Sequence, residues 1–209
     1  MDTSYEVKAQ QSGANFIAGI DEVGRGALAG PVVAAAVILD LNNIPDGLND
    51  SKKLSALKRE KLDKEIRSTA IAFSIARIEA EEIDRINILQ ATRKAMIAAI
   101  QALSPNPDYL LIDALRLQEL KIKQEAIIKG DAKSVSIAAA SIIAKVARDH
   151  WMSEYGKVFS LYDFGSNSGY GTAFHVSALR QHGHSSIHRL TFRKVLPEPE
   201  QENLFSEAR

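Results

Sequence analysis

Residues 16–39 read FIAGIDEVGRGALAGPVVAAAVIL, and this stretch decides the fold. An apolar run ends on two adjacent carboxylates, Asp21 and Glu22, and a glycine-arginine-glycine turn follows at residues 24–26. A Gly-Pro break then leads into a second apolar run rich in Val and Ala, which is typical of a strand buried on both faces. The stretch therefore predicts a strand, an acidic turn, a glycine loop and a second strand.

The composition is that of an ordinary globular protein. The chain has 209 residues, of which 45% are hydrophobic and 25% charged, and this fits one domain with a sizeable core. It has no cysteine, so it offers neither disulfides nor thiolate chemistry. No apolar run approaches the roughly 18 residues that span a bilayer, and the first residues do not resemble a signal peptide, so we expect a cytoplasmic protein without membrane contact. The net charge is zero, which neither supports nor excludes a nucleic-acid partner.

Strands and helices are predicted to alternate along the chain, which indicates an α/β domain with a mixed sheet. Strands are expected at residues 16–21, 31–39, 71–78, 109–113 and 125–129. Helices are expected at residues 2–13, 56–69, 80–103 with a break near Asn87, 134–155 and 173–181. Ser55 is expected to cap the helix at 56–69, with Leu57 and Leu62 facing inward. We expect residues 1–195 to form one domain and the acidic, proline-bearing residues 196–209 to form a flexible tail.

Three of the predicted strands have carboxylates at or just after their ends: Asp21 with Glu22, Asp113, and Asp131. Four carboxylates gathered at one sheet edge would repel one another and resist shared ionisation unless cations neutralise them. Oxygen ligands suit Mg²⁺ or Mn²⁺, and two such ions can support phosphodiester cleavage. The alternative is that each acid is an ordinary turn residue, with Asp131 capping the helix that follows.

The glycine turn also satisfies the G-x-G-x-x-A form of the dinucleotide-binding fingerprint. That fingerprint must open a helix, whose N-terminus holds the pyrophosphate. Here Gly30-Pro31 and a β-branched run follow, so the dinucleotide interpretation is rejected. The glycines keep another use beside Arg25, because backbone N–H groups and a guanidinium can hold a phosphate.

Five blocks of sequence follow one another in a distinctive order. They are DEVGRGALAGPVVAAAVIL at 21–39, DSKKLS at 50–55, LLIDALRL at 110–117, KGDAKSVSIAAASIIAKVARDHWM at 129–152 and SGYGTAFHVSALRQHGHSSIHRLTF at 168–192. Together they closely resemble ribonuclease HII, the type 2 ribonuclease H family. The resemblance implies an α/β ribonuclease H-like fold, with a mixed sheet flanked by helices and a helical C-terminal segment. It also implies a monomeric endonuclease that acts in ribonucleotide and primer removal.

The implied reaction is cleavage of RNA in RNA–DNA hybrids and incision 5′ to single ribonucleotides in duplex DNA, leaving 3′-hydroxyl and 5′-phosphate ends. Its cofactor would be Mg²⁺ or Mn²⁺, with two ions present when substrate is bound. The implied metal-binding catalytic residues are Asp21, Glu22, Asp113 and Asp131. One departure from the family pattern lies beside them: Ala114 follows Asp113, where the family usually has glycine.

The resemblance also implies how the ribonucleotide is recognised. The residues Gly24, Arg25 and Gly26 would contact the backbone around the ribonucleotide and sense its 2′-hydroxyl, the group that tells RNA from DNA. Tyr170 would stack on the deoxyribose that follows, so that the pair would recognise an RNA-to-DNA junction. From the residue type alone, Tyr170 is equally well a packed aromatic side chain in a loop.

Further substrate contacts are expected from basic and polar residues. Lys52 in the DSKKLS block is expected to contact phosphate, whereas its neighbour Lys53 is as readily a solvated lysine. Ser141, Lys145 and Arg148 are spaced by four and three, so they share one helix face that is expected to point toward bound backbone.

The C-terminal segment is the best candidate for a basic patch that grips a duplex. Its basic residues are Arg180, Arg189, Arg193 and Lys194. Three nearby histidines, His182, His184 and His188, lack matching cysteine or carboxylate partners, so a zinc site is not expected there.

The end of the chain carries a separate hypothesis. Gln201, Leu204 and Phe205 form a Q-x-x-L-F pattern that resembles the short peptides that bind bacterial sliding clamps. Two apolar anchors in a disordered tail make a reasonable docking peptide. The alternative is an untethered tail, because patterns of five residues are common.

Two other functions compete with the ribonuclease. The first is a nucleic-acid-binding protein that keeps the fold but lacks catalysis, and the presence of all four acids argues against it. The second is another nuclease on this fold, such as a resolvase or transposase nuclease. The glycine-arginine-glycine loop and Tyr170 argue against that one.

Overall fold

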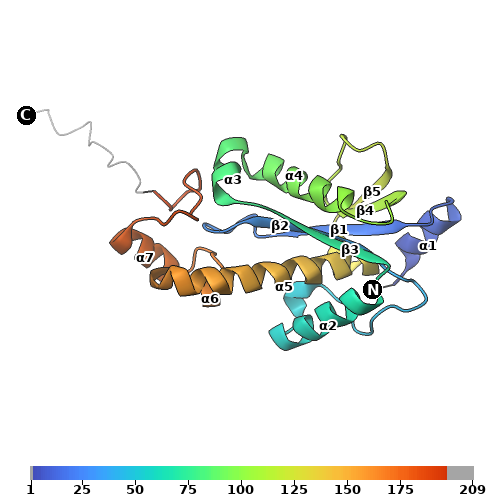
Figure 1. Cartoon of the computed structure of the whole chain (residues 1–209), viewed down its shortest axis with the longest axis horizontal. Coiled ribbons are helices and arrows are strands. Elements are labelled where there is room, and N and C mark those ends of the chain that lie inside the picture. The colour runs from blue at the N-terminus through green and yellow to red at the C-terminus, as the bar shows by residue number, and fades with distance from the viewer. Residues whose placement is uncertain (1, 197–209) are drawn as a thin grey trace, which may run out of the picture.

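A five-stranded mixed sheet forms the centre of the computed structural model, which describes residues 2–196 (Figure 1). The strand order is β3-β2-β1-β4-β5, and the strands are β1 (Ile17–Val23), β2 (Val32–Ile38), β3 (Ala72–Ile78), β4 (Tyr109–Asp113) and β5 (Lys123–Ile127). β1 pairs antiparallel with β2 and parallel with β4, while β2–β3 is antiparallel and β4–β5 parallel. This confirms the predicted mixed sheet, with each strand within two residues of its expected position.

Helices cover both faces of the sheet (Figure 1). They are α1 (Ser4–Gln11), α2 (Ala56–Thr69), α3 (Ala80–Ile86), α4 (Ile88–Gln101), α5 (Val135–Val158), α6 (Phe164–Asn167) and α7 (Ala173–His182), with short 3₁₀ helices η1 (Ser51–Lys53), η2 (Gly130–Ala132) and η3 (Ser160–Tyr162). Strand β2 explains the layering, because every residue in it is buried. Its residues Ala34, Ala36 and Ile38 pack in the cluster with α4, and the alternate residues 33, 35 and 37 pack in the cluster with α2 and α5.

Small residues let α5 lie directly on β1. A Cβ atom added at Gly19 in β1 would overlap the backbone of Ser136 and Ile137 in α5. Ser134 fixes the start of this helix, because its side chain accepts a hydrogen bond from the N–H of Ile137. The 24-residue helix therefore runs across the sheet in close contact with the strand that carries Asp21.

The predicted helix boundaries hold where capping residues mark them. Ser55 accepts a hydrogen bond from the N–H of Lys58 and starts α2 as expected. Asn87 separates α3 from α4: it has a φ of 67°, and its side chain caps α4. The expected inward position of Leu57 is wrong, because this side chain is 80% exposed, whereas Leu62 is fully buried.

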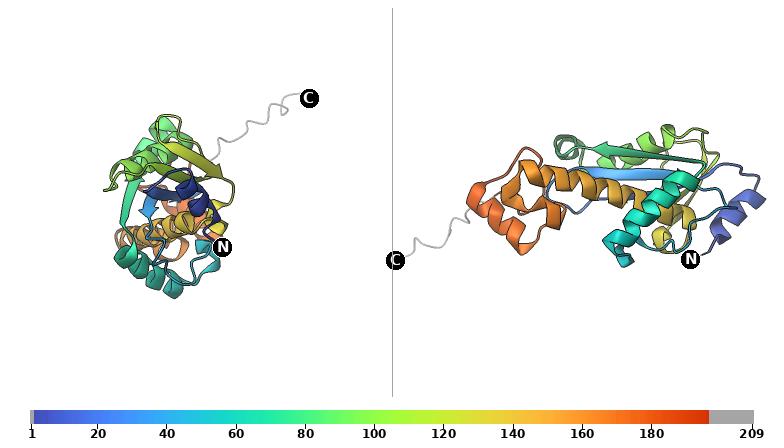
Figure 2. Two further views of the ribbon diagram at one scale, coloured as in Figure 1. Left: turned by 90° about the vertical axis from the view of Figure 1, so that its right-hand side faces the viewer. Right: turned by 60° about the horizontal axis from the view of Figure 1, so that its bottom comes forward.

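A smaller lobe extends from one end of α5, opposite α1 (Figure 2). It contains η3, α6, α7 and the segment up to residue 196, packed around a core that includes Tyr162, Phe164 and Leu179. The loop at residues 24–31, here called the glycine loop, follows β1. Its residues Leu28 and Ala29 belong to the same core, so the lobe is joined to this loop. No helix within residues 2–196 is long and apolar enough to cross a membrane. The expected tail, apart from Leu196, lies outside the described residues.

Candidate active site

The four predicted carboxylates lie on neighbouring elements at one edge of the sheet. Asp21 and Glu22 are near the end of β1, Asp113 is the last residue of β4, and Asp131 lies in η2 just after β5. Strands β1, β4 and β5 are adjacent and parallel, so their carboxyl ends share an edge. The charges interact: Asp113 raises the pKa of both Asp21 and Glu22, and Asp131 raises that of Asp113.

Burial makes this group of acids costly when it is ionised. Burial raises the pKa of Asp21 well above its ordinary value, and the charge of Glu22 adds to the effect. Burial is also the largest cause of the raised pKa of Glu22 and of Asp113. Asp21 and Asp131 are each only 5% exposed. Such a set of repelling oxygen donors suits hard divalent cations, whose charge would stabilise the ionised form.

Nearby groups hold the acids in place. Asp113 accepts a hydrogen bond of 2.8 Å from the N–H of Gly130, and Asp21 accepts one of 2.8 Å from the N–H of Glu22. A hydrogen bond from Ser141 lowers the pKa of Asp21 and partly offsets the effect of burial. Within residues 2–196, no three His, Asp or Glu side chains lie in an arrangement that could hold a metal ion as they stand.

Two basic residues lie beside the carboxylates. The Nζ of Lys52 is 3.4 Å from Asp131, and its side chain is 81% exposed, so it can meet both the acid and an incoming phosphate. A guanidinium nitrogen of Arg25 lies 3.4 Å from Glu22. Both positions are consistent with the substrate contacts predicted for these residues, which stay predictions.

The glycine loop is held by two buried arginines. Arg189 donates to the carbonyl of Arg25 at 2.9 Å and twice to that of Gly30, at 3.0 and 2.8 Å. Arg148 donates to the carbonyls of Pro31 (3.0 Å), Ala29 (3.2 Å) and Ser168 (2.8 Å). Both arginines are fully buried. Gly24 lies against Arg148 with a φ of 90°, so it must lack a Cβ for two reasons.

The expected contact of Arg148 with bound backbone is therefore wrong. Its guanidinium is fully buried and already donates to three carbonyls, so its role is to fix the loops. The same helix face also turns Ser141 inward: it is 5% exposed and bonds to Ser51 at 2.9 Å. Lys145 is half-buried and pairs with Asp149 at 2.7 Å. The spacing of these three residues predicts the shared face correctly but not what that face meets.

The structure brings Tyr170 to the glycine loop. The N–H groups of Leu28 and Ala29 donate to the carbonyl of Gly169, at 2.8 and 3.3 Å. The guanidinium of Arg148 lies 5.4 Å from the centre of the Tyr170 ring. The ring remains partly exposed. The loop that ends in Tyr170 and the loop at residues 24–31 thus form one unit.

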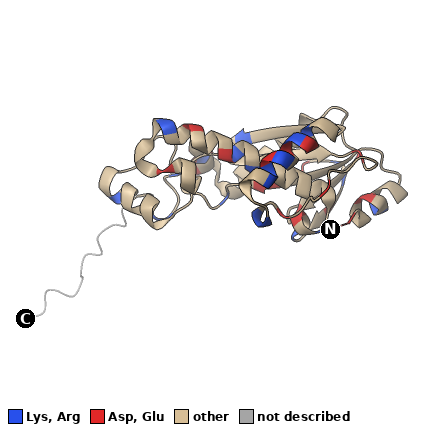
Figure 3. Ribbon diagram, turned by 90° about the horizontal axis from the view of Figure 1, so that it is seen from below, with Lys and Arg blue, Asp and Glu red and all other residues tan. Residues whose placement is uncertain are grey.

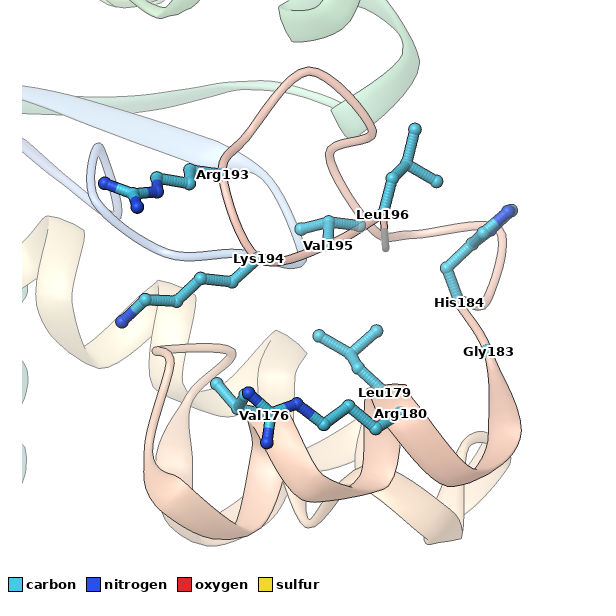
Figure 4. A pocket seen from close by; sticks show the side chains of 9 residues that line it. All are labelled: Val176, Leu179, Arg180, Gly183, His184, Arg193, Lys194, Val195 and Leu196. Carbon is cyan, nitrogen blue, oxygen red and sulfur yellow. The ribbon is translucent and has the colours of Figure 1, made fainter. Parts of the chain in front are cut away.

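A separate cavity of about 590 Å³ lies in the C-terminal lobe, with none of the four carboxylates in its lining (Figure 4). In it, α7 residues face the segment at 193–196. The lining includes Arg180, His184, Arg193 and Lys194, which supports the predicted basic patch at these positions. The expected membership of Arg189 is wrong, because this side chain is buried under the glycine loop.

Sequence reasoning missed the structural roles of Arg189, His175 and His188. From the sequence, His188 is only a weak zinc candidate, but it is buried and bonds to His175 at 2.9 Å. A buried arginine that pairs with carbonyls leaves no acidic partner to search for in the sequence. The aromatic residues Tyr162 and Phe164 were a possible signal, because their rings pack against the two histidines.

Ala114 gives a first prediction. It has a φ of 53°, a left-handed conformation that favours glycine, and its N–H donates to the carbonyl of Ile127. The change Ala114→Gly should raise the free energy of unfolding by about 0.5–1 kcal/mol, because this conformation costs alanine roughly 1–2 kcal/mol and the entropy of unfolded glycine offsets part of the gain. Urea unfolding measures it. Ala126→Gly, in the extended β5, is the matched control and should lower the same quantity; a loss at both positions would contradict the prediction.

Comparison with known proteins gives a consistent result. The family model for ribonuclease HII matches residues 18–195. The ribonuclease HII of Acetivibrio thermocellus is 54% identical over 190 residues, covering 91% of this chain and 74% of that protein. That of Desulfitobacterium hafniense is 58% identical over 180 residues, covering 86% and 69%.

Solved structures show the same fold. The chain is similar to ribonuclease H2 of Pyrococcus horikoshii, with a TM-score of 0.71, 27% identity and coverage of 87% and 95% of the two chains. It is also similar to the ribonuclease HII solved in a PCNA complex from Archaeoglobus fulgidus (TM-score 0.68, 29% identity, coverage of 83% and 92%). A Bst ribonuclease HIII solved with Mn²⁺ is 21% identical, with a TM-score of 0.70 and coverage of 90% and 70%, and supports the fold alone.

Proposed function

The chain belongs to the ribonuclease HII family, and on that premise we propose that its four clustered carboxylates hold divalent cations, two of them when substrate is bound. The family acts on RNA in RNA–DNA hybrids and on ribonucleotides embedded in DNA, and this chain is such a metal-dependent endonuclease. Mg²⁺ or Mn²⁺ suits the all-oxygen donor set of Asp21, Glu22, Asp113 and Asp131. When bound, these cations lower the pKa of water and stabilise the oxygen that leaves.

The chain's own residues position the substrate in this proposal. Arg25 and the flanking glycines present a guanidinium and backbone N–H groups to the phosphates around the ribonucleotide and to its 2′-hydroxyl. The ring of Tyr170 stacks on the next deoxyribose, and Lys52 meets the phosphate beside Asp131. The observation that carries this proposal is the pair of hydrogen bonds from Leu28 and Ala29 to Gly169, which join the two loops. Incision then falls 5′ to the ribonucleotide and leaves 3′-hydroxyl and 5′-phosphate ends.

A duplex with one ribonucleotide tests the proposal directly. With Mg²⁺ or Mn²⁺, we expect a single cut on the 5′ side of the ribonucleotide, and no cut when that residue carries a 2′-O-methyl group, because the hydroxyl can then no longer donate a hydrogen bond. Equal cutting of an all-DNA duplex would indicate a nuclease of the resolvase class. Binding without cutting would indicate an inactive binding module.

The basic cavity of the C-terminal lobe gives a prediction for duplex binding. Along the ribbon in Figure 3, acidic and basic residues are interspersed, in keeping with a net charge of zero. The cavity of Arg180, His184, Arg193 and Lys194 is a local exception, since none of its lining residues is acidic. Replacing Arg180 and Lys194 together with Gln should reduce the slope of log K against log salt by about 0.9 for each phosphate that these side chains neutralise.

Salt titration of binding to an uncleavable 2′-O-methyl duplex measures this slope. Lys8→Gln is the control, because Lys8 lies on α1 at the opposite end of the molecule, where it pairs with Glu125 (Figure 1). An unchanged slope in the double variant, or an equal change in the control, would contradict the prediction.

The tail hypothesis concerns residues outside the described part of the chain. Gln201, Leu204 and Phe205 are proposed to bind the sliding clamp, and the complex of PCNA with an archaeal relative supports a partner of this kind. Titration of full-length and tail-truncated chains against the clamp tests it, and no binding of the full chain at high micromolar concentration would contradict it. A monomer acting in the cytoplasm remains our expectation.

A further inference from the structure

Two buried histidines connect the C-terminal lobe to Tyr170. The Nε2 atoms of His175 and His188 are 2.9 Å apart, and the two residues are 0% and 2% exposed. The Nδ1 of His175 lies 2.9 Å from the carbonyl oxygen of Tyr170. The Nδ1 of His188 lies 2.9 Å from the backbone nitrogen of Ser185 and 2.8 Å from its hydroxyl. The four residues thus form an unbroken chain of hydrogen bonds.

The groups at the two ends of this hydrogen-bonded series determine which ring nitrogen of each histidine carries the proton. The N–H of Ser185 can only donate, so Nδ1 of His188 must accept, and its ring proton is on Nε2. That proton is donated to Nε2 of His175, whose own proton must then be on Nδ1. There it is donated to the carbonyl of Tyr170, which can only accept. Both rings are neutral, because an added proton would set two N–H groups against each other.

The surroundings favour the neutral pair. The rings of Tyr162 and Phe164 pack edge-on or tilted against both histidines. Burial lowers the pKa of His175, and it lowers that of His188 to about 4, with further lowering by His175 and the nearby His184. Tyr162 and His184 are the other titratable groups beside the pair, and no carboxylate contributes to either shift. This series of hydrogen bonds from Ser185 to Tyr170, here called the histidine relay, should therefore be intact at neutral pH.

His188 also lies against the glycine loop. Its neighbours Ile187 and Arg189 bond through their backbones to Gly30 and Leu28, at 2.8 and 2.9 Å. The segment at residues 187–189 therefore bonds to the glycine loop through its backbone. The side chain of His188, in the same segment, is linked through His175 to the backbone of Tyr170. This fixes the position of Tyr170 relative to residues 24–26 from a second side, independently of Arg148.

We propose that His175 and His188 are positioning residues, whose neutral relay fixes Tyr170 and so sets the preference for an RNA–DNA junction over a continuous hybrid. This rests on the proposed role of Tyr170. A continuous RNA strand has no deoxyribose next to the cut for Tyr170 to stack on. Loss of the relay should therefore affect the junction substrate selectively, which general destabilisation of the protein would not do.

The test compares kcat/KM on a duplex with one ribonucleotide and on a continuous RNA–DNA hybrid. The variant His175→Phe keeps an aromatic ring but removes both hydrogen bonds, and should lower the ratio of junction to hybrid activity about tenfold, mainly through KM. His175→Asn keeps a donor near the position of Nδ1 and should restore most of that ratio. An equal fall on both substrates would overturn the relay proposal alone. Tyr170→Ala is the reference: if it leaves the ratio unchanged, the assigned role of Tyr170 and the relay proposal both fail.

A measurement on the unmodified protein does not depend on whether the variants fold. Nitrogen-15 NMR of the histidine rings should show a protonated Nε2 and bare Nδ1 in His188, and the reverse in His175. Both rings should remain neutral at pH 6. The opposite tautomers, or titration of either ring near its ordinary pKa of about 6.5, would overturn the proposal.

Discussion

The change Asp21→Asn should lower the rate of cleavage by more than about 100-fold at saturating Mg²⁺ or Mn²⁺. Removal of outer partners of a metal ligand alone costs roughly 10–100-fold, and Asp21 is proposed to be a ligand itself. Asp21 is also almost fully buried, and its pKa is raised by that burial and by the charges of Glu22 and Asp113. Single-turnover cleavage of the duplex with one ribonucleotide measures the effect without interference from product release.

The matched control is Asp63→Asn. Asp63 is also a buried carboxylate, 8% exposed, but it lies on α2 and pairs with Arg67 at 2.8 Å. Its replacement should leave the cleavage rate unchanged while costing some stability. If Asp21→Asn cut as fast as the unmodified chain, the carboxylates would not be the catalytic centre.

Asp21→Asn should also raise the free energy of unfolding of the metal-free protein. The pKa of Asp21 is higher in the folded state than in the unfolded state, so the folded state binds the proton more tightly and stability falls as pH rises through that interval. At neutral pH, where Asp21 of the unfolded chain is ionised, keeping this carboxyl group in the metal-free fold therefore costs stability, and the uncharged Asn removes that cost. Urea unfolding in EDTA would reveal the gain, and the gain should shrink as the pH is lowered toward the unfolded pKa of Asp21.

Gly19→Ala should lower the free energy of unfolding by about 3 kcal/mol, the upper end of the usual cost of overpacking. The added methyl group would overlap the backbone of Ser136 and Ile137, and a backbone cannot move aside as a flexible side chain can. Helix α5 would have to lift from β1, which would also separate Ser141 from Asp21. The yield of folded protein and the urea midpoint both measure the effect.

Gly165→Ala is the control for that prediction. Gly165 lies in α6 with open space where its Cβ would be and without a positive φ, so alanine there should change stability by no more than about 0.5 kcal/mol. Similar midpoints for the two variants would show that the close contact between α5 and β1 does not limit stability.

Local patterns in the sequence are enough to predict most of the framework. The capping residues Ser55 and Asn87 mark helix ends through bonds to their own neighbours, so no distant partner is needed to find them. The uninterrupted apolar character of β2 reports burial on both faces. The carboxylates are predictable for a similar reason, because each comes at or just after the end of a strand, and the carboxyl ends of parallel strands share an edge.

What the sequence does not reveal depends on partners far along the chain. Helical spacing places Arg148 on a face but does not identify what that face meets, which is a set of loop carbonyls rather than the substrate. The His175–His188 pair becomes visible only once the C-terminal lobe is folded. Leu57 is expected to face inward because it is apolar, yet the core under α2 is filled by Leu62 and Ile66.

Helix α5 sets the spacing between the carboxylate cluster and the glycine loop. Ser141 on this helix bonds to Asp21, and Arg148, seven residues later, donates to a carbonyl of the glycine loop. Seven residues make about two helical turns and span about 10 Å, so the two residues lie on the same side of the helix. One inserted residue between them would rotate Arg148 by about 100° away from its carbonyls. The distance between the carboxylate cluster and the loop at residues 24–31 is thus set by the rise of a single helix.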